Sequence, residues 1–227
     1  MLFVIFAYLI FCGAQAQADE SVCYGATDKG WLENGVQLPS ESKNFQAYSS
    51  LGCLLGRTYV HSKVRDIVVF AYRSLEESAP EKIFVYGETG WSSGGRIRPH
   101  KTHQNGLSVD FMVPITDKEG KSVPLPCSMF NKVGYNIEFD SSGRYGEYKI
   151  DFEAMAEHLY QIHRAATEQG VEIWRVIFDP GLQPSLFKTR RGPYIQQYMT
   201  FSKKPSWVRH DEHYHIDFSV KCKKHED

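Results

Sequence analysis

Residues 209–218 read RHDEHYHIDF, and their histidines follow the spacing H-x-x-H-x-H. Polar and apolar residues alternate from His213 to Val220, which predicts a strand. Alternate side chains of a strand share a face. One face then carries His213, His215 and Asp217, and the other carries Tyr214, Ile216 and Phe218. The apolar face belongs to a core, whereas the polar face is either exposed to water or part of a metal site.

A second group of candidate metal ligands lies upstream, in the stretch RPHKTHQNGLSVDF at residues 98–111. His103 lies in a glycine-rich loop, and Asp110 lies in an apolar run at 107–113 that predicts a strand. Gly106 allows the chain to turn between them, so that both side chains approach one point. An aspartate buried in a strand needs a partner, either loop amides or a metal ion. Because catalytic zinc takes three protein ligands, this pair and the downstream histidines together predict a zinc site.

Hydrophobic periodicity predicts two helices and two further strands. The helices are expected at 57–78, stopped by Pro80, and at 152–169, closed by Gly170. Short apolar runs predict strands at 82–86 and 171–178. Residues 19–56 are expected to form an irregular arm, and residues 115–148 a long surface excursion of undetermined role. This order predicts an α+β fold, with helices packed on one side of a central, mostly antiparallel sheet.

The composition suits one domain with a substantial core, since 42% of the 227 residues are hydrophobic and 14% are aromatic. We expect a single domain from residue 19 to residue 227. The formal net charge is -1, and the sequence has no basic stripe, aromatic RNA platform or basic amphipathic helix. Nucleic acid is therefore excluded as a partner, as is general attraction to an anionic membrane.

Residues 1–18 are expected to be a secretory signal peptide. An apolar run from Met1 to Cys12 precedes two overlapping A-x-A patterns between Ala14 and Ala18. The run is shorter than the roughly 20 apolar residues that span a membrane, so no stable membrane insertion is expected after its removal. Export places the mature chain in the periplasm. The segment has no Lys or Arg before its apolar run, so a retained N-terminal anchor stays open.

Four cysteines remain after the signal peptide, namely Cys23, Cys53, Cys127 and Cys222. An even number of cysteines in an exported chain favours two disulfides. Four cysteines allow three pairings, and the sequence does not choose among them. No C-x-x-C pair is present, so a structural zinc site made of cysteines is not expected.

Four segments together carry a resemblance to a known family. They are GVQLP at 35–39, GRTYVHSKVRD at 56–66, GGRIRPHKTHQNGLSVD at 94–110 and P-x-W-x-x-H-D-x-H-x-H at 205–215. The pattern H-x6-D followed by H-x-H resembles that of the zinc peptidases grouped with lysostaphin, D-alanyl-D-alanine peptidases and sonic hedgehog. Within this group the chain is most similar to the penicillin-insensitive murein endopeptidases, over residues 35–218. The resemblance implies the metallopeptidase fold of that group.

The resemblance also implies one zinc ion per chain, bound by His103, Asp110 and His215. It implies that His213 is the catalytic histidine beside the metal, and that His210 and His100 are further active-site histidines. The chemistry of the residues agrees, because one imidazole takes a proton from water or stabilises an oxyanion while another donates to the leaving amine. The spacing does not decide which of His213 and His210 has which role. Glu212 is expected on the core-side face of the strand, away from the reaction.

Four other residues are assigned to substrate binding or to support of the ligands. Arg96 and Arg98 either bind a substrate carboxylate through a bidentate contact or are solvated. Trp207 either forms a wall of the cleft or packs beside the strand. Asp217 is expected to accept a hydrogen bond from an imidazole.

The predicted function is that of a secreted or periplasmic zinc-dependent murein endopeptidase that acts on peptidoglycan stem peptides. The first expectation is hydrolysis of the D-alanyl bond to meso-diaminopimelate, a D,D crosslink. Three alternatives stay open: an L,D-endopeptidase associated with a cell-wall-spanning secretion system, a D-Ala-D-Ala carboxypeptidase, and a non-catalytic zinc-containing module that binds the cell wall or a protein. The complete set of active-site histidines favours a hydrolase over a binding module. The sequence does not identify a partner in the cell wall or in a secretion apparatus.

Overall fold

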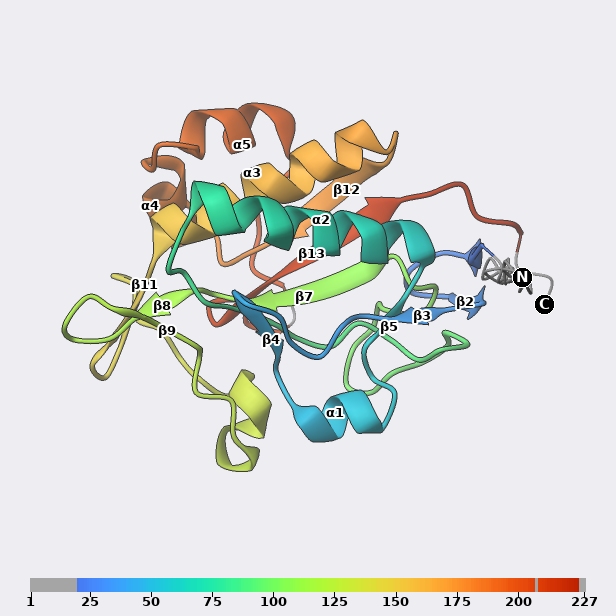
Figure 1. Cartoon of the computed structure of the whole chain (residues 1–227), viewed down its shortest axis with the longest axis horizontal. Helices are drawn as coiled ribbons and strands as arrows, with labels where there is room; N and C mark the ends of the chain where they lie inside the picture. The colour runs from blue at the N-terminus through green and yellow to red at the C-terminus, as the bar shows by residue number, and fades with distance from the viewer. Residues whose placement is uncertain (1–19, 207, 225–227) are drawn as a thin grey trace, which may run out of the picture.

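A five-stranded sheet forms the centre of the structure, a computed structural model that describes residues 20–206 and 208–224. Its strands follow the order β12, β13, β7, β6, β4 (Figure 1). Their bounds are Glu172–Ile177 for β12, His213–Ser219 for β13, Ser108–Met112 for β7, Phe84–Tyr86 for β6 and Phe45–Ala47 for β4. Neighbouring strands are antiparallel except β4 and β6, which are parallel. The predicted sheet is confirmed, while the signal peptide predicted at 1–18 and Trp207 lie outside the described residues.

Two long helices cover one face of this sheet (Figure 1). They are α2 (Ser62–Ser78) and α3 (Phe152–Glu168), and each turns an apolar stripe inward. A cluster of rings fills the space between these helices and the strands, formed by Tyr72, Phe84, Phe111, His158 and Tyr214. Two shorter helices, α4 (Gln183–Phe187) and α5 (Gly192–Tyr198), pack on α3. The α+β fold with helices on one side of the sheet is therefore confirmed.

The first long helix begins at Ser62 rather than at Arg57, where the periodicity placed its start. Tyr59 and Val60 instead form β5, which pairs with β3 (Val36–Gln37). His61 then caps the helix, because its Nδ1 accepts a hydrogen bond from the backbone N–H of Lys63 at 3.2 Å. The prediction was wrong at this end because an apolar residue at position 60 fits the helical spacing as well as a short strand.

Residues 19–56 were predicted to be irregular, but the described part of this range holds four short strands and a helix. β1 (Val22–Gly25) and β2 (Gly30–Glu33) form a hairpin, and α1 spans Ser50–Leu54. The strands β3 and β4 pair with β5 and β6. These strands are two to four residues long, which is too short for periodicity to distinguish them in sequence.

The excursion predicted at 115–148 contains a sheet of its own. Its strands follow the order β10, β11, β8, β9, with bounds Arg144–Tyr145, Tyr148–Ile150, Ile115–Thr116 and Ser122–Val123. The 3-10 helix η1 (Met129–Gly134) lies between β9 and β10 and ends at Tyr135. The phenol of Tyr135 reaches Asp110 in the central sheet, so this segment contributes to the polar site as well as to the surface.

One disulfide joins Cys23 to Cys222, whereas Cys53 and Cys127 are free thiols. The expectation of two disulfides was therefore wrong. Cys53 lies on α1 with its sulfur 3.9 Å from the hydroxyl of Tyr86, and Cys127 packs beside η1. The two sulfurs occupy different parts of the fold, so the even number of cysteines did not imply a second bond.

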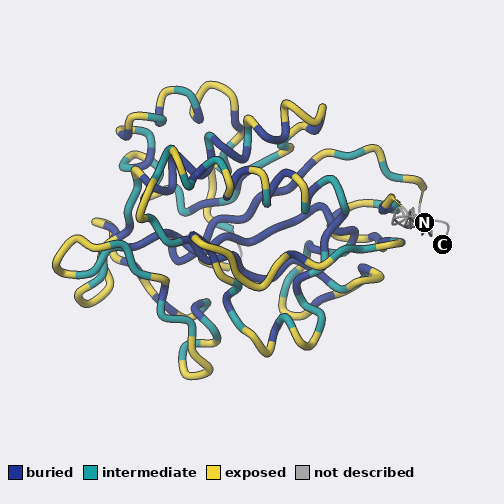
Figure 2. The backbone as a smooth tube through the Cα atoms, viewed as in Figure 1, coloured by how far each residue is buried: buried dark blue, intermediate teal, exposed yellow. Residues whose placement is uncertain are grey.

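Strands β7 and β13 run through the most buried part of the molecule (Figure 2). Every residue of β7 is buried, and β13 is buried from His213 to Phe218. Polar side chains on these strands are therefore shielded from bulk water and need partners within the fold. Among the helices of the described residues, none has the length and apolar character required to cross a membrane.

Candidate active site

The pairing of β7 with β13 brings together the two polar motifs of the sequence. His215 lies opposite Asp110, and Asp217 lies opposite Ser108. Alternation along both strands turns these side chains to the sheet face opposite α2 and α3. The exposed fraction of each of the four is 3% or less, so the polar row does not face open water.

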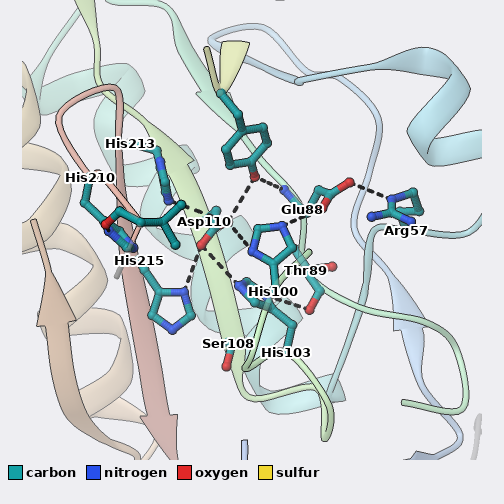
Figure 3. Close-up of polar contacts among 12 residues, drawn as sticks. Arg57, Glu88, Thr89, His100, His103, Ser108, Asp110, His210, His213 and His215 are labelled. Carbon is teal, nitrogen blue, oxygen red and sulfur yellow. Dashed lines mark hydrogen bonds and ion pairs between the residues drawn. The ribbon is translucent and has the colours of Figure 1, made fainter. Parts of the chain in front are cut away.

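The carboxylate of Asp110 is the centre of the site (Figure 3). Its Oδ1 lies 3.2 Å from Nε2 of His103 and 2.8 Å from Nδ1 of His215. The His103 ring is oriented by its other nitrogen, since Nδ1 lies 3.0 Å from the carbonyl oxygen of Thr89. Three candidate metal-binding atoms from a loop and two strands therefore converge on one point.

The loop that carries His103 reaches Asp110 through a sharp turn at Gly106. Gly106 has φ +76°, and a Cβ atom there would lie 2.7 Å from the backbone nitrogen of His61. Only glycine combines this backbone conformation with such close packing. The turn expected between the two candidate ligands is thus present.

The second oxygen of Asp110 faces groups that sequence reasoning did not assign to it. The hydroxyl of Tyr135 donates a hydrogen bond to Oδ2 at 2.9 Å and accepts one from the backbone N–H of Glu88 at 2.9 Å. His100 Nδ1 and His213 Nε2 lie 3.7 and 3.9 Å from the same oxygen. No local pattern marks Tyr135, because its segment has neither helical nor strand periodicity.

Glu88 orients His100 from the outer side of the site (Figure 3). Its carboxylate lies 2.6 Å from His100 Nε2, and it accepts hydrogen bonds from Arg57 Nε at 2.6 Å and from the hydroxyl of Tyr48 at 3.0 Å. Burial opposes ionisation of this carboxyl, but His100 and Arg57 lower its pKa to about 2. Glu88 is thus a buried anion that holds one nitrogen of His100 and leaves the other directed at Asp110.

Asp217 supports His215 in the way expected from the sequence pattern. Its Oδ1 lies 2.8 Å from His215 Nε2 and accepts a hydrogen bond from Ser108 Oγ at 2.5 Å. Its Oδ2 accepts a hydrogen bond from Arg175 Nε at 2.6 Å. These contacts fix the ring of His215, so that its Nδ1 is directed at Asp110.

Glu212 was expected on the core side of the strand, but it lies against a histidine of the site. Its Oε1 is 3.0 Å from Nδ1 of His213, and its side chain borders the cleft described below. The strand begins at His213, so the alternation that places later residues does not extend back to Glu212. Burial raises the pKa of the Glu212 carboxyl to about 7.

The remaining histidines of the site are neutral near pH 7. Burial lowers the pKa of His213 to about 4 and that of His210 to about 3. The two rings lie beside each other, with centroids 4.5 Å apart, and His210 Nδ1 is 2.9 Å from the carbonyl oxygen of Val208. Burial also opposes ionisation of Asp110, yet the surrounding histidines hold the pKa of that carboxyl well below its usual range.

The geometry favours a site for a metal ion with nitrogen and oxygen ligands. His103 Nε2 is buried and has no hydrogen-bond partner in the described structure, which leaves a lone pair for a metal. Two overlapping ligand sets are present, since ligand atoms of His100, His103 and Asp110 also lie within 4.8 Å of one another. His100 and His215 are held alike, because each has one ring nitrogen on an anchoring carboxylate, Glu88 at 2.6 Å and Asp217 at 2.8 Å, and turns the other toward Asp110. The His215 nitrogen is the nearer of the two, at 2.8 Å from Asp110 against 3.7 Å for His100. One carboxylate and two imidazoles form a ligand set that suits zinc.

A cleft of about 1110 Å³ opens over this site on the face opposite the helices. Its lining includes every histidine of the site except His103, together with Asp110, Glu88 and Tyr135. Residues of η1 and Trp174 and Arg175 of β12 also line it. Arg96 and Arg98 are exposed and do not line the cleft, so their predicted contact with a substrate carboxylate stays a prediction.

The comparison with known proteins agrees with this site. A family model described as penicillin-insensitive murein endopeptidase matches residues 23–227. The match includes the loop with His103, the strand with Asp110 and the downstream histidines. No curated protein matches the chain.

Proposed function

The chain belongs to the penicillin-insensitive murein endopeptidase family, and from this premise we propose that it is a zinc-dependent hydrolase of murein crosslinks. Family membership makes it a peptidase that acts on murein. The convergence of His103 Nε2 and His215 Nδ1 on the buried carboxylate of Asp110 supports the metal dependence. The first choice of bond is the one from D-alanine to meso-diaminopimelate.

We assign the zinc ligands to His103, Asp110 and His215. Zinc bound there supplies a Lewis acid that polarises a peptide carbonyl and makes water more acidic. Thr89 and Asp217 hold the two imidazole rings, which fixes the nitrogens that each ring presents. Tyr135 holds Oδ2 of Asp110, so Oδ1, which faces His103 and His215, would be the oxygen available to a metal.

His213 is the proposed general base. Its low pKa keeps the ring neutral near pH 7, as a base requires, and its Nε2 faces the metal ligands. Glu212 holds Nδ1 and stabilises the positive charge that the ring gains when it takes a proton. His210 is neutral as well, so it acts as an acid toward the leaving amine only after it receives a proton. The adjacent ring of His213 is a suitable donor.

The shape of the cleft supports an endopeptidase. The cleft of about 1110 Å³ is lined by residues of η1 and of β12 as well as by Asp110, and a volume of this size has room for chain on both sides of a cut bond. A carboxypeptidase for terminal D-Ala-D-Ala needs space for only a single residue beyond that bond. An L,D-endopeptidase remains the second candidate, because the lining does not distinguish the configuration of the residues.

The proposal also covers the cellular location of the protein and its organisation as a single domain. Murein is the substrate of the family, which suggests a periplasmic protein. The match from residue 23 to residue 227 supports one peptidase domain. Removal of residues 1–18 as a leader is part of the proposal. A zinc-containing module without catalysis is the alternative of another class.

Muropeptide release tests this function. Purified diaminopimelate-type peptidoglycan is digested with the zinc-loaded protein, with His103→Ala and with protein plus chelator, and the products are identified by mass spectrometry. We expect monomers from crosslinked dimers with the native protein alone, and the fragment masses distinguish D,D from L,D cleavage. Bound zinc at one equivalent with no release of any fragment would support the binding module.

A further inference from the structure

Strand β12 contains a bulge where it borders the cleft. Ile173 pairs with Phe218 and Arg175 pairs with Asp217, so Trp174 is an extra residue with no opposite partner on β13. A bulge of this kind interrupts the alternation of side chains between the two faces. Trp174 and Arg175 therefore both line the cleft, although they are consecutive in sequence.

The two side chains form one unit. The guanidinium carbon of Arg175 lies 4.3 Å from the centroid of the Trp174 ring, and the ring is 55% exposed. Arg175 Nε donates to Asp217 Oδ2 at 2.6 Å. One face of the guanidinium is thus covered by indole and one edge is held by a fully buried carboxylate.

Among the residues that the structure describes, the remaining edge of Arg175 has no partner. Its terminal nitrogens make no hydrogen bond or ion pair with any residue that the structure describes, and a third of the side chain is exposed. A held guanidinium with free N–H groups in a cleft is suited to bind a carboxylate with two parallel hydrogen bonds. Its contact with Asp217 and indole limits the entropy lost on binding.

The position of Arg175 relative to the proposed zinc ligands is also fixed. Asp217 contacts Arg175 with one oxygen and His215 with the other, so a single carboxylate separates the guanidinium from a proposed ligand of the metal. Along β12, Arg175 is two residues from Ile177, which pairs with His215. The Cα atoms of Arg175 and Ile177 are therefore about 6.6 Å apart along the strand.

We propose that Trp174 and Arg175 form a subsite for the free carboxylate beside the scissile amide of a murein crosslink. The inference rests on the proposed function and names the group that the same site recognises. In a D-alanyl to diaminopimelate crosslink, the carbon that bears the amide nitrogen also bears a free carboxylate. That carboxylate lies only a few bonds from the carbonyl, so a group that recognises it must border the proposed ligands, as Arg175 does through the carboxylate of Asp217 that it shares with His215. The indole provides an apolar wall for the hydrocarbon part of the same residue.

Two substrates that differ in a single group test the subsite, so the test does not depend on one variant of the protein. Two crosslinked stem-peptide dimers are compared, one with the free carboxylate and one with that group converted to a carboxamide. The carboxamide dimer cannot make the charge-assisted contact with Arg175. The native protein should therefore cleave the dimer with the free carboxylate with a kcat/KM about 10- to 100-fold higher than that for the carboxamide dimer. Arg175→Gln should reduce this ratio to about one, and Arg175→Lys should give an intermediate ratio because it keeps the charge but not the two parallel donors.

Controls distinguish recognition from support of the fold. Zinc content is measured for each variant, because Arg175 also contacts Asp217. A purely structural role would lower cleavage of both dimers equally and leave their ratio unchanged. Arg164→Gln, on the exposed face of α3 where it pairs with Glu168, should keep the native ratio.

The outcomes separate the two proposals. Equal cleavage of acid and amide by the native protein would overturn the subsite and leave the endopeptidase assignment intact. If Arg98→Gln lost the preference for the carboxylate dimer while Arg175→Gln kept it, the carboxylate would be recognised by the loop that carries Arg98. That result would also overturn the subsite at Trp174 and Arg175. Cleavage of neither dimer by zinc-loaded native protein would overturn the proposed function, and with it the subsite.

Discussion

Asp110 has a different environment on each of its two oxygens. The inner oxygen faces His103 and His215, and the outer one accepts a hydrogen bond from Tyr135. Burial raises the pKa of Tyr135 well above its ordinary value, so its hydroxyl keeps its proton and acts as a donor at any physiological pH. The tyrosine therefore holds one oxygen of the carboxylate, and the other faces the two imidazoles.

Removal of that hydroxyl should weaken zinc binding. We expect Tyr135→Phe to raise the zinc Kd by about 10-fold or more, because partners that orient a metal ligand contribute on that scale. Competition with a chromophoric chelator measures the Kd. The matched control is Tyr145→Phe, since Tyr145 is exposed on strand β10 and its ring packs on that of Phe139. Equal zinc affinity in Tyr135→Phe and native protein would show that the phenol does not position Asp110.

At the scale of elements, the disulfide holds one side of the cleft. Cys23 belongs to β1, and Cys222 lies in the segment after β13, which ends at Ser219. The segment after β13 also pairs with β1, since Lys223 N donates to the carbonyl of Cys23 at 2.9 Å and Gly25 N donates to that of Lys223 at 3.0 Å. Gly25 and Cys222 both line the cleft, so the bond fixes two elements that border the site.

Loss of this bond should destabilise the fold. We expect Cys23→Ala/Cys222→Ala to lower the free energy of unfolding by roughly 2–4 kcal/mol, because the bond closes a long loop and restricts the unfolded chain. Denaturant titration measures the change. Cys53→Ala/Cys127→Ala is the control with the same number of changes, and reductant should lower the stability of this control and of the native protein alike. A native protein that is insensitive to reductant would contradict the prediction.

At the scale of the whole molecule, His158 lies where helices and sheet meet. It is fully buried among the rings of Tyr72, Phe84 and Phe111, and its Nδ1 is 2.7 Å from the hydroxyl of Tyr214. Burial lowers its pKa to about 3. The imidazole is therefore neutral in the folded protein, and it does not line the cleft.

The fold should lose stability in acid through this residue. An unfolded histidine has a pKa of about 6.5, so below that pH the unfolded chain takes a proton that the folded chain does not. The contribution of His158 is complete above pH 6.5 and falls by up to about 1.4 kcal/mol per pH unit as the pH drops toward the folded pKa. The slope of unfolding free energy against pH is compared in Tyr214→Phe and Tyr214→Phe/His158→Phe. The double variant should have the shallower slope, and equal slopes would show that His158 does not couple folding to pH.

The sequence by itself determined the class of fold and the identity of the family. Periodicity is a local property, so the long helix α3 and strands β7, β12 and β13 were predicted to within one or two residues of their ends. The spacing of His103, Asp110 and the later histidines also indicated a metal site. The match to residues 23–227 confirms the resemblance, and the structure brings the predicted ligands together.

Only the tertiary structure decided the partners of those ligands. Tyr135 is separated from Asp110 by 25 residues and Ser108 from Asp217 by 109, and no local pattern indicates such contacts. The bulge that turns Trp174 and Arg175 to the same face depends on pairing with β13, although an arginine within the apolar run VEIWRVIF was a sign of an unusual strand. The disulfide between Cys23 and Cys222 likewise depends on the packing of β1 beside the segment after β13. Residue types along the chain determine which elements form, whereas the packing of distant elements determines which side chains meet.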